Sequence, residues 1–253
     1  MKKLFIAFLI VCLASACKDK TKTSEGASEM ATEDASEQLN ENDDQWIVLF
    51  DGTSFDAWKG YLKDEMPAEW KLEDNAMVFY PPEQREEGES FNIVTKADYT
   101  NFVLSIEWRI SDAGNSGIFW GVKEDPNLPE AYQSGPEIQV LDNTKHPDAK
   151  VNGKTHQAGS LYDMVAPSQD VTKPAGEWNT CIITVNHKVN KGSVVLNEVE
   201  IASFPVNGEP WNTMVSKSKF ADWEHFGKYP TGKIGLQDHG DVVAYRNIKI
   251  KEL

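Results

Sequence analysis

The sequence predicts an all-β fold, either a β-sandwich or a jelly roll. Around a dozen short segments alternate apolar and polar residues, and Gly, Asn, Asp and Pro separate them. Segments with a helical period are sparse, and we expect only two helical turns, near residues 211–217 and 221–226. No internal repeat divides the 253 residues. Many short strands within one domain are typical of sandwiches and jelly rolls.

The first strand is expected at 46–50, where the apolar run Trp-Ile-Val-Leu-Phe meets a turn at Asp51-Gly52. A hairpin follows, with strands at 70–73 and 76–79 around an Asp-Asn turn. The remaining strands are expected at 91–95, 102–110, 116–120, 137–141, 178–185, 193–196, 199–201, 233–236 and 243–251. The globular domain therefore spans residues 45–253.

Residues 1–16 have the pattern of a signal peptide. Two lysines precede an apolar run, residues 4–14, which is too short to span a bilayer. Cys17 directly follows Ala-Ser-Ala and so resembles the acylated cysteine of a bacterial lipobox, although ordinary cleavage after Ala16 is the alternative. We expect lipidation at Cys17 and an exported protein anchored to the bacterial cell envelope, periplasmic or surface-exposed, by lipid alone.

Residues 17–44 contain almost no large apolar side chain, so they are expected to form a disordered acidic tether. A helix at 29–39 is the alternative. Signal cleavage removes Cys12, and lipidation of Cys17 leaves Cys181 as the other cysteine. The domain is then expected to hold no disulfide, with Cys181 as a small buried residue.

The net charge of −15 and a pI near 4.8 argue against nucleic-acid binding, because a phosphate backbone would be repelled. A neutral, hydroxyl-rich ligand fits better, and the many aromatic residues offer flat faces on which sugar rings stack. A small carbohydrate is therefore the expected partner.

Glu137 and Gln139 are two positions apart on an expected strand, so their side chains share one face while Ile138 and Val140 point to the other. Two polar groups on one face of an apolar strand indicate a binding or catalytic site. The alternative is a solvated sheet face with Glu137 as an ordinary surface acid.

Seven motifs along the domain together resemble the 3-keto-disaccharide hydrolase family. They are Leu49-Phe50-Asp51-Gly52 with Trp58, then Trp70, Gly114-Asn115-Ser116-Gly117-Ile118, Glu137-Ile138-Gln139-Val140-Leu141-Asp142, Gly176-Glu177-Trp178-Asn179, Leu236-Gln237-Asp238-His239-Gly240 and Arg246-Asn247-Ile248. The resemblance implies a concanavalin A-like jelly roll. It also implies cleavage of 3-keto-glycosides by elimination to a 2-hydroxy-glucal and hydration.

This chemistry needs a base for the C2 proton, a proton donor for the C1 oxygen, and a group that stabilises the enolate. The acid/base pair is expected to be Glu137 and His156, and the other catalytic candidates are Asp238 and His239 at the end of a strand. The expected substrate-binding residues are Asn115, Trp120, Gln139, Lys154 and Tyr162.

Ordinary structural roles compete with these assignments. Asn115 and the Asp238-His239 pair occupy turn sequences, Trp120 fits a core position, and His156 fits a surface loop. The sequence has no zinc-type Cys/His spacing, phosphate loop or EF-hand loop, but a divalent cation held by carboxylates and His stays open. At the level of function, a non-catalytic carbohydrate-binding module and a purely structural lipoprotein are the alternatives.

Overall fold

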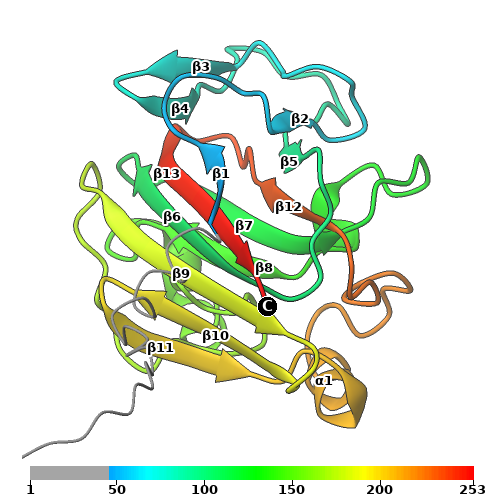
Figure 1. Cartoon of the computed structure of the whole chain (residues 1–253). Coiled ribbons are helices and arrows are strands. Elements are labelled where there is room, and N and C mark those ends of the chain that lie inside the picture. The colour runs from blue at the N-terminus through cyan, green and yellow to red at the C-terminus, as the bar shows by residue number, and fades with distance from the viewer. Residues whose placement is uncertain (1–45) are drawn as a thin grey trace, which may run out of the picture. The chain divides into compact units, whose positions relative to one another are not determined.

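The computed structural model describes residues 46–253, which form two antiparallel β-sheets (Figure 1). The predicted all-β jelly-roll sandwich is confirmed. The signal peptide, the tether and Cys17 lie outside the described residues. Within the described part of the chain, no helix has the length and apolar character needed to cross a membrane.

The larger sheet has eight strands in the order β11-β10-β9-β6-β13-β4-β3, and β1 pairs with β13 as well. Its strands are β1 (Ile47–Phe50), β3 (Trp70–Glu73), β4 (Ala76–Phe79), β6 (Phe102–Ile110), β9 (Asn179–Asn186), β10 (Lys191–Leu196), β11 (Val199–Phe204) and β13 (Val243–Glu252). The first and last strands of the domain are thus neighbours.

The smaller sheet has five strands in the order β2-β5-β12-β7-β8. Its strands are β2 (Trp58–Gly60), β5 (Ile93–Thr95), β7 (Asn115–Val122), β8 (Glu137–Leu141) and β12 (Lys233–Leu236). Strand β2 was not predicted from the sequence, because three residues are too few to show alternation.

The core lies between the sheets because each sheet turns one set of alternate side chains inward. In β6 the residues Phe102, Leu104, Ile106, Trp108 and Ile110 are buried, and the residues between them are partly exposed. One apolar cluster joins these side chains to others from the smaller sheet. Cys181 of β9 is a free cysteine in this core, as predicted.

Regular helix is limited to α1 (Gly208–Val215) and three short 3-10 helices, η1 (Ala131–Gln133), η2 (Pro147–Lys150) and η3 (Asn152–Lys154), among the described residues. The predicted turn at 211–217 therefore corresponds to α1. The predicted helical turn at 221–226 is wrong, since this segment forms non-helical turns. Its Trp223 and Phe226 side chains pack on each other and on the preceding Phe220.

Candidate active site

The candidate site lies on the face of the smaller sheet that points away from the core. Ile118 of β7 and Ile138 of β8 belong to the core cluster. The residues next to each of them along its strand must therefore face the opposite side. The strand register places Gly117 opposite Gln139. Just beyond β12, the Gln237 backbone N–H donates to the carbonyl oxygen of Gly117 at 2.9 Å. Three adjacent strands thus deliver polar side chains to one surface.

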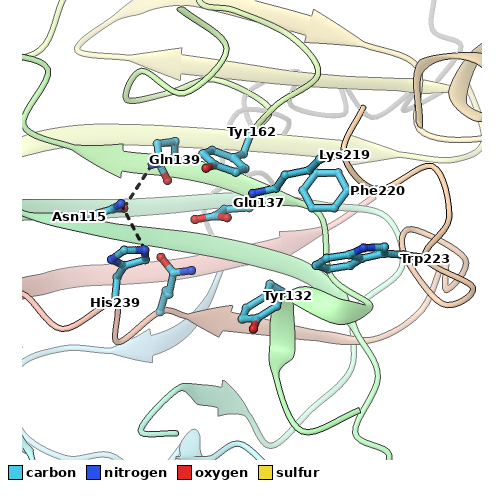
Figure 2. Close-up of a pocket in the computed structure, with 10 residues that line it drawn as sticks. Asn115, Tyr132, Glu137, Gln139, Tyr162, Lys219, Phe220, Trp223 and His239 are labelled. Atoms are coloured by element: carbon cyan, nitrogen blue, oxygen red, sulfur yellow. Dashed lines mark hydrogen bonds between the residues drawn. The ribbon is translucent and has the colours of Figure 1, made fainter. Parts of the chain in front are cut away.

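A pocket of about 300 Å³ opens on this face. Its lining residues come from β7, β8, η1 and three loops: Asn115, Tyr132, Glu137, Gln139, Tyr162, Lys219, Phe220, Trp223, Gln237 and His239. Figure 2 shows Glu137 in the middle of this group, with Asn115 and His239 at one end and Phe220 and Trp223 at the other. Aromatic walls with a few convergent polar groups are typical of small-molecule sites.

Glu137 is the most unusual group in the pocket, because its side chain is buried and only 7% of the residue is exposed. Burial raises the pKa of Glu137 from 4.5 to about 8, although the positive charge of Lys219 opposes this shift. Gly117 makes room for the carboxyl group: a Cβ atom at that position would overlap Glu137 Oε1. Glu137 is therefore a protonated acid near neutral pH and not the surface acid of the alternative interpretation.

Two amide side chains connect Glu137 to His239. Gln139 Nε2 lies 3.3 Å from Asn115 Oδ1, and Asn115 Nδ2 lies 3.5 Å from His239 Nε2. In this orientation Gln139 Oε1 faces Glu137 Oε1. With the amide turned, Gln139 Nε2 would instead donate to Glu137 Oε1 and to the Ser116 carbonyl oxygen, each at 3.0 Å. The turned orientation is the one that satisfies the amide, so Gln139 presents its donor to the carboxyl group.

His239 stands at the rim of the pocket, in the turn after β12, and keeps part of its side chain exposed. Desolvation by the surrounding protein lowers the pKa of His239 below 6.5, and Asp241 opposes this effect. The ring of His146 packs edge-on at 6.5 Å between centroids. His239 is therefore a neutral imidazole near pH 7, with the properties of a base.

His156 does not line the pocket, and its side chain is buried between two carboxylates. Nδ1 lies 2.8 Å from Asp148 Oδ1, and Nε2 lies 2.9 Å from Asp163 Oδ1. The ring stacks on Tyr162 with centroids 4.2 Å apart, and the Tyr162 hydroxyl donates to Asp148 Oδ2. Both ring nitrogens of His156 are thus engaged, and the structure does not bring His156 together with Glu137 in the pocket. It positions Tyr162 in the pocket wall.

Asp238 is also outside this pocket and is engaged in structural contacts. Its Oδ2 lies 2.7 Å from Arg85 Nη2 and accepts the Phe91 backbone N–H at 2.6 Å. Burial raises the pKa of Asp238 to about 6, while Arg85 lowers it. The expected catalytic role is therefore not supported, and Asp238 instead fixes the segment around Arg85.

Two expected substrate-binding residues lie elsewhere. Trp120 is 4% exposed and stacks on Phe204 in the core, because it shares the inward face of β7 with Ile118. Lys154 ends the exposed helix η3 and is not among the lining residues of the pocket. Neither residue is placed to contact a ligand in the pocket, whereas the expected residues Asn115, Gln139 and Tyr162 do line it.

Five lining residues were missed by the sequence interpretation: Tyr132, Lys219, Phe220, Trp223 and Gln237. Gln237 could have been found, because it is two positions beyond Gly235 on the outward-facing set of β12. Tyr132 comes from η1 and the other three from the loop after α1, where no strand periodicity marks the residues that face the pocket. Lys219 Nζ lies 4.2 Å from the centre of the Tyr162 ring, so a loop cation is held beside Glu137.

Residues 46–253 contain no group of three or more His, Cys, Asp or Glu side chains arranged to hold a metal ion.

The chain matches a family described as 3-keto-alpha-glucoside-1,2-lyase-like domain over residues 45–251. It is 35% identical over 294 residues to the 3-keto-disaccharide hydrolase of Bacteroides thetaiotaomicron, and the match covers 100% of both chains.

Two crystal structures of candidate glycosyl hydrolases from Parabacteroides distasonis are also similar. One has a TM-score of 0.74 at 29% identity and covers 83% of this chain and 94% of its own. The other has a TM-score of 0.58 at 26% identity and covers 83% and 84%, respectively.

Proposed function

Because the chain belongs to the family of 3-keto-alpha-glucoside-1,2-lyase-like domains, we propose that it cleaves 3-keto-glycosides, 3-keto-disaccharides among them, by elimination followed by hydration. The net reaction is hydrolysis. The observation that carries this proposal is the pairing of an acid kept protonated, Glu137, with a base kept neutral, His239, in one pocket. A site that raises the pKa of an acid and lowers the pKa of a neighbouring base suits acid/base catalysis.

In the elimination step, the His239 imidazole takes the C2 proton, which the neighbouring C3 ketone makes acidic. The electron pair of the C2–H bond forms an enolate on the C3 oxygen. This electron pair then returns to form the C1=C2 double bond and expels the C1 oxygen, which receives the Glu137 proton. The ammonium group of Lys219 lines the same pocket and stabilises the transient enolate charge.

The hydration step uses the protonation states that elimination leaves behind. Glu137 is then a carboxylate and takes a proton from water as the water oxygen bonds to C1, while protonated His239 returns a proton to C2. The two steps together restore the starting enzyme. In its turned orientation Gln139 donates to Glu137 Oε1 and so stabilises the carboxylate that elimination leaves.

The direct test incubates the purified protein with methyl 3-keto-α-glucoside and with unoxidised methyl α-glucoside, and follows products by mass spectrometry. We expect only the ketone to be consumed, because only its C2 proton is acidic. A 2-hydroxy-glucal detected before the free keto-sugar would support elimination. Equal turnover of both glycosides would contradict the proposal and indicate a two-carboxylate glycosidase.

A non-catalytic carbohydrate-binding role is the alternative, and the aromatic side chains of Tyr132 and Trp223 in the pocket would suit it. A binding site has no need for a buried carboxylic acid, which costs stability. Binding of methyl 3-keto-α-glucoside without product formation would favour this alternative.

We propose that the domain acts at the bacterial cell envelope, exported by residues 1–16 and anchored through a lipid on Cys17 with residues 17–44 as a tether. The support is the position of Cys17 directly after Ala-Ser-Ala at the end of an apolar run.

A further inference from the structure

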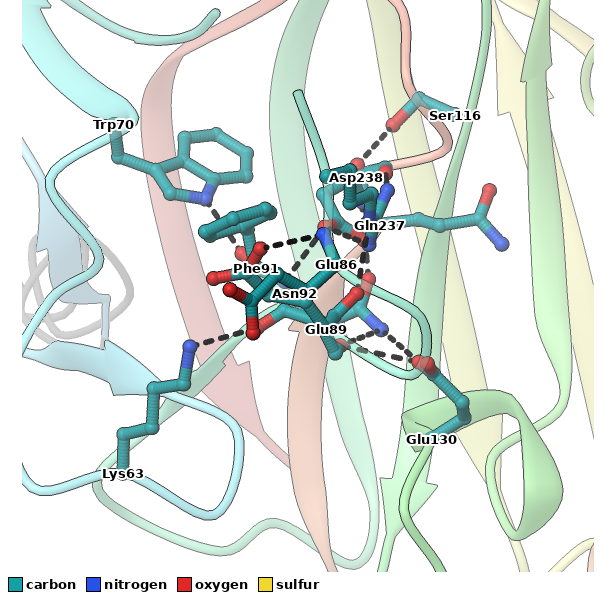
Figure 3. Close-up of polar contacts among 12 residues, drawn as sticks. Lys63, Trp70, Glu86, Glu89, Phe91, Asn92, Ser116, Glu130, Gln237 and Asp238 are labelled. Atoms are coloured by element: carbon teal, nitrogen blue, oxygen red, sulfur yellow. Dashed lines mark hydrogen bonds and ion pairs between the residues drawn. The ribbon is translucent and has the colours of Figure 1, made fainter. Parts of the chain in front are cut away.

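A second, smaller hollow adjoins the candidate active site. It measures about 170 Å³ and shares Tyr132, Gln237 and His239 with the larger pocket. Its other lining residues are all polar, and they are Arg85, Asn92, Glu130 and Asp238. We call this set the polar hollow. Figure 3 shows the contacts that hold several of these side chains together.

Arg85 is held rigidly at the polar hollow. Its Nε donates to the Glu89 carbonyl oxygen at 2.8 Å, while Nη1 and Nη2 donate to the carbonyl and carboxylate oxygens of Asp238 at 3.2 and 2.7 Å. The guanidinium carbon lies 5.2 Å from the centre of the Phe91 ring. Arg has five N–H donors, so two remain for a ligand in a fixed direction.

Glu130 offers the complementary acceptor. Its Oε2 accepts hydrogen bonds from Ser90 Oγ at 3.1 Å and Asn92 Nδ2 at 2.8 Å. Its Oε1 takes part in neither of these two hydrogen bonds. The polar hollow thus holds Arg85 as a fixed donor and Glu130 as a fixed acceptor. Neighbouring sugar hydroxyls can bind both, because each hydroxyl donates and accepts.

Gln237 lies where the two hollows meet, and its Oε1 is buried without a partner among the described residues. An unpaired buried carbonyl oxygen is destabilising, and a hydroxyl donor from a bound ligand would satisfy it. The unpaired Gln237 carbonyl oxygen thus lies between the two hollows, where a ligand that spans both could donate to it.

The charges favour a neutral ligand. Asp238 already pairs with Arg85, and Glu130 adds a second carboxyl group. An anionic sugar would meet more negative than positive charge there, so a neutral sugar fits best.

We propose that the polar hollow binds the second sugar ring of a disaccharide, while the keto-sugar ring lies beside Glu137 in the larger pocket. The inference rests on the proposed function. The scissile bond then crosses the shared wall at Gln237 and His239, and the substrate class is a neutral 3-keto-disaccharide. The leaving sugar is recognised by Arg85 and Glu130, which take no part in proton transfer.

The test compares two substrates that share the reacting ring: maltose oxidised at C3 of its non-reducing glucose, and methyl 3-keto-α-glucoside. The wild-type protein should have a kcat/KM at least roughly 10-fold higher for the keto-disaccharide, as expected for the loss of charge-assisted hydrogen bonds in the smaller substrate. Arg85→Lys and Glu130→Gln should abolish most of this preference, because each lowers kcat/KM for the keto-disaccharide more than kcat/KM for the methyl glycoside. Arg109→Lys, which alters an arginine stacked on Trp178 in the other sheet, is the matched control and should keep the preference.

Equal wild-type rates on the two keto-substrates would overturn the second-ring site, and this result requires no variant to fold. A preference that survives both substitutions in folded protein would also overturn it. Turnover of neither keto-substrate by the wild type would instead refute the proposed function itself, so the two failures are distinguishable.

Discussion

Replacing Glu137 by Gln keeps the shape of the side chain and removes the ionisable proton from the buried site. The structure allows the size of the effect on stability to be worked out. A pKa raised from 4.5 to about 8 corresponds to roughly 5 kcal/mol at about 1.36 kcal/mol per pKa unit. This figure is an upper limit, because water that enters the open pocket would reduce the penalty of ionisation.

The direction in which stability changes with pH follows from the number of protons that each state binds. In the unfolded chain Glu137 ionises above about pH 4.5, whereas in the folded protein it stays protonated until about pH 8. The folded state binds more protons between these values, so its stability falls as pH rises through this window. Gln does not titrate, so the Glu137→Gln variant does not lose stability in this way. Glu137→Gln should therefore match the wild type within about 1 kcal/mol at pH 5 and exceed it by about 1–3 kcal/mol at pH 9.

Urea unfolding at pH 5, 7 and 9 measures the difference, with Glu65→Gln at an exposed position as the matched control. Turnover of the 3-keto-glucoside by Glu137→Gln should fall by roughly 10²-fold or more. Wild-type kcat/KM should itself fall above about pH 8, as the acid loses its proton. Parallel pH–stability curves for wild type and variant would refute the reasoning, and near-normal turnover would show that the proton donor lies elsewhere.

Three further predictions concern single substitutions. Gly117→Ala should displace the Glu137 carboxyl group, whose oxygen a Cβ would overlap, and lower kcat by roughly 10-fold or more with the circular dichroism spectrum retained; unchanged kcat would contradict the placement of Glu137. His239→Ala should reduce turnover by roughly 10²-fold, far more than His187→Ala, a histidine outside the pocket, and equal losses in the two variants would argue against His239 as the base. Cys17→Ala should release the protein from membranes into the soluble fraction, and continued detergent-dependent partitioning would count against lipidation.

The sequence predicted the sheet and the two strand positions at the centre of the site because alternation is a local property. Glu137 and Gln139 had to share a face once their strand was recognised, and the structure places both in the pocket. Five predicted strands have the observed bounds, and nearly all the others differ by one or two residues at an end, as at β7, where 116–120 became Asn115–Val122.

The site residues that lie on loops could not be predicted, because their positions depend on which loops the folded sandwich brings together. His156 looked like a free imidazole, but the fold places Asp148 and Asp163 against its two nitrogens. Lys219 carries no local sign of function, and only the folded loop holds it over Tyr162. Charge and hydrogen-bond partners distant along the chain decide whether a titratable side chain is available for chemistry.

The cost of keeping Glu137 buried explains why the site is better understood as catalytic than as purely binding. A sheet face that only binds sugars gains nothing from an acid that weakens the fold as pH rises toward 8, and a Gln at that position would offer similar hydrogen bonds. Gly117 leaves the space that this carboxyl group occupies, and the Gln139 and Asn115 amides lie between it and His239. A destabilising group accommodated by its neighbours is typical of sites where proton transfer, not affinity, is the property required.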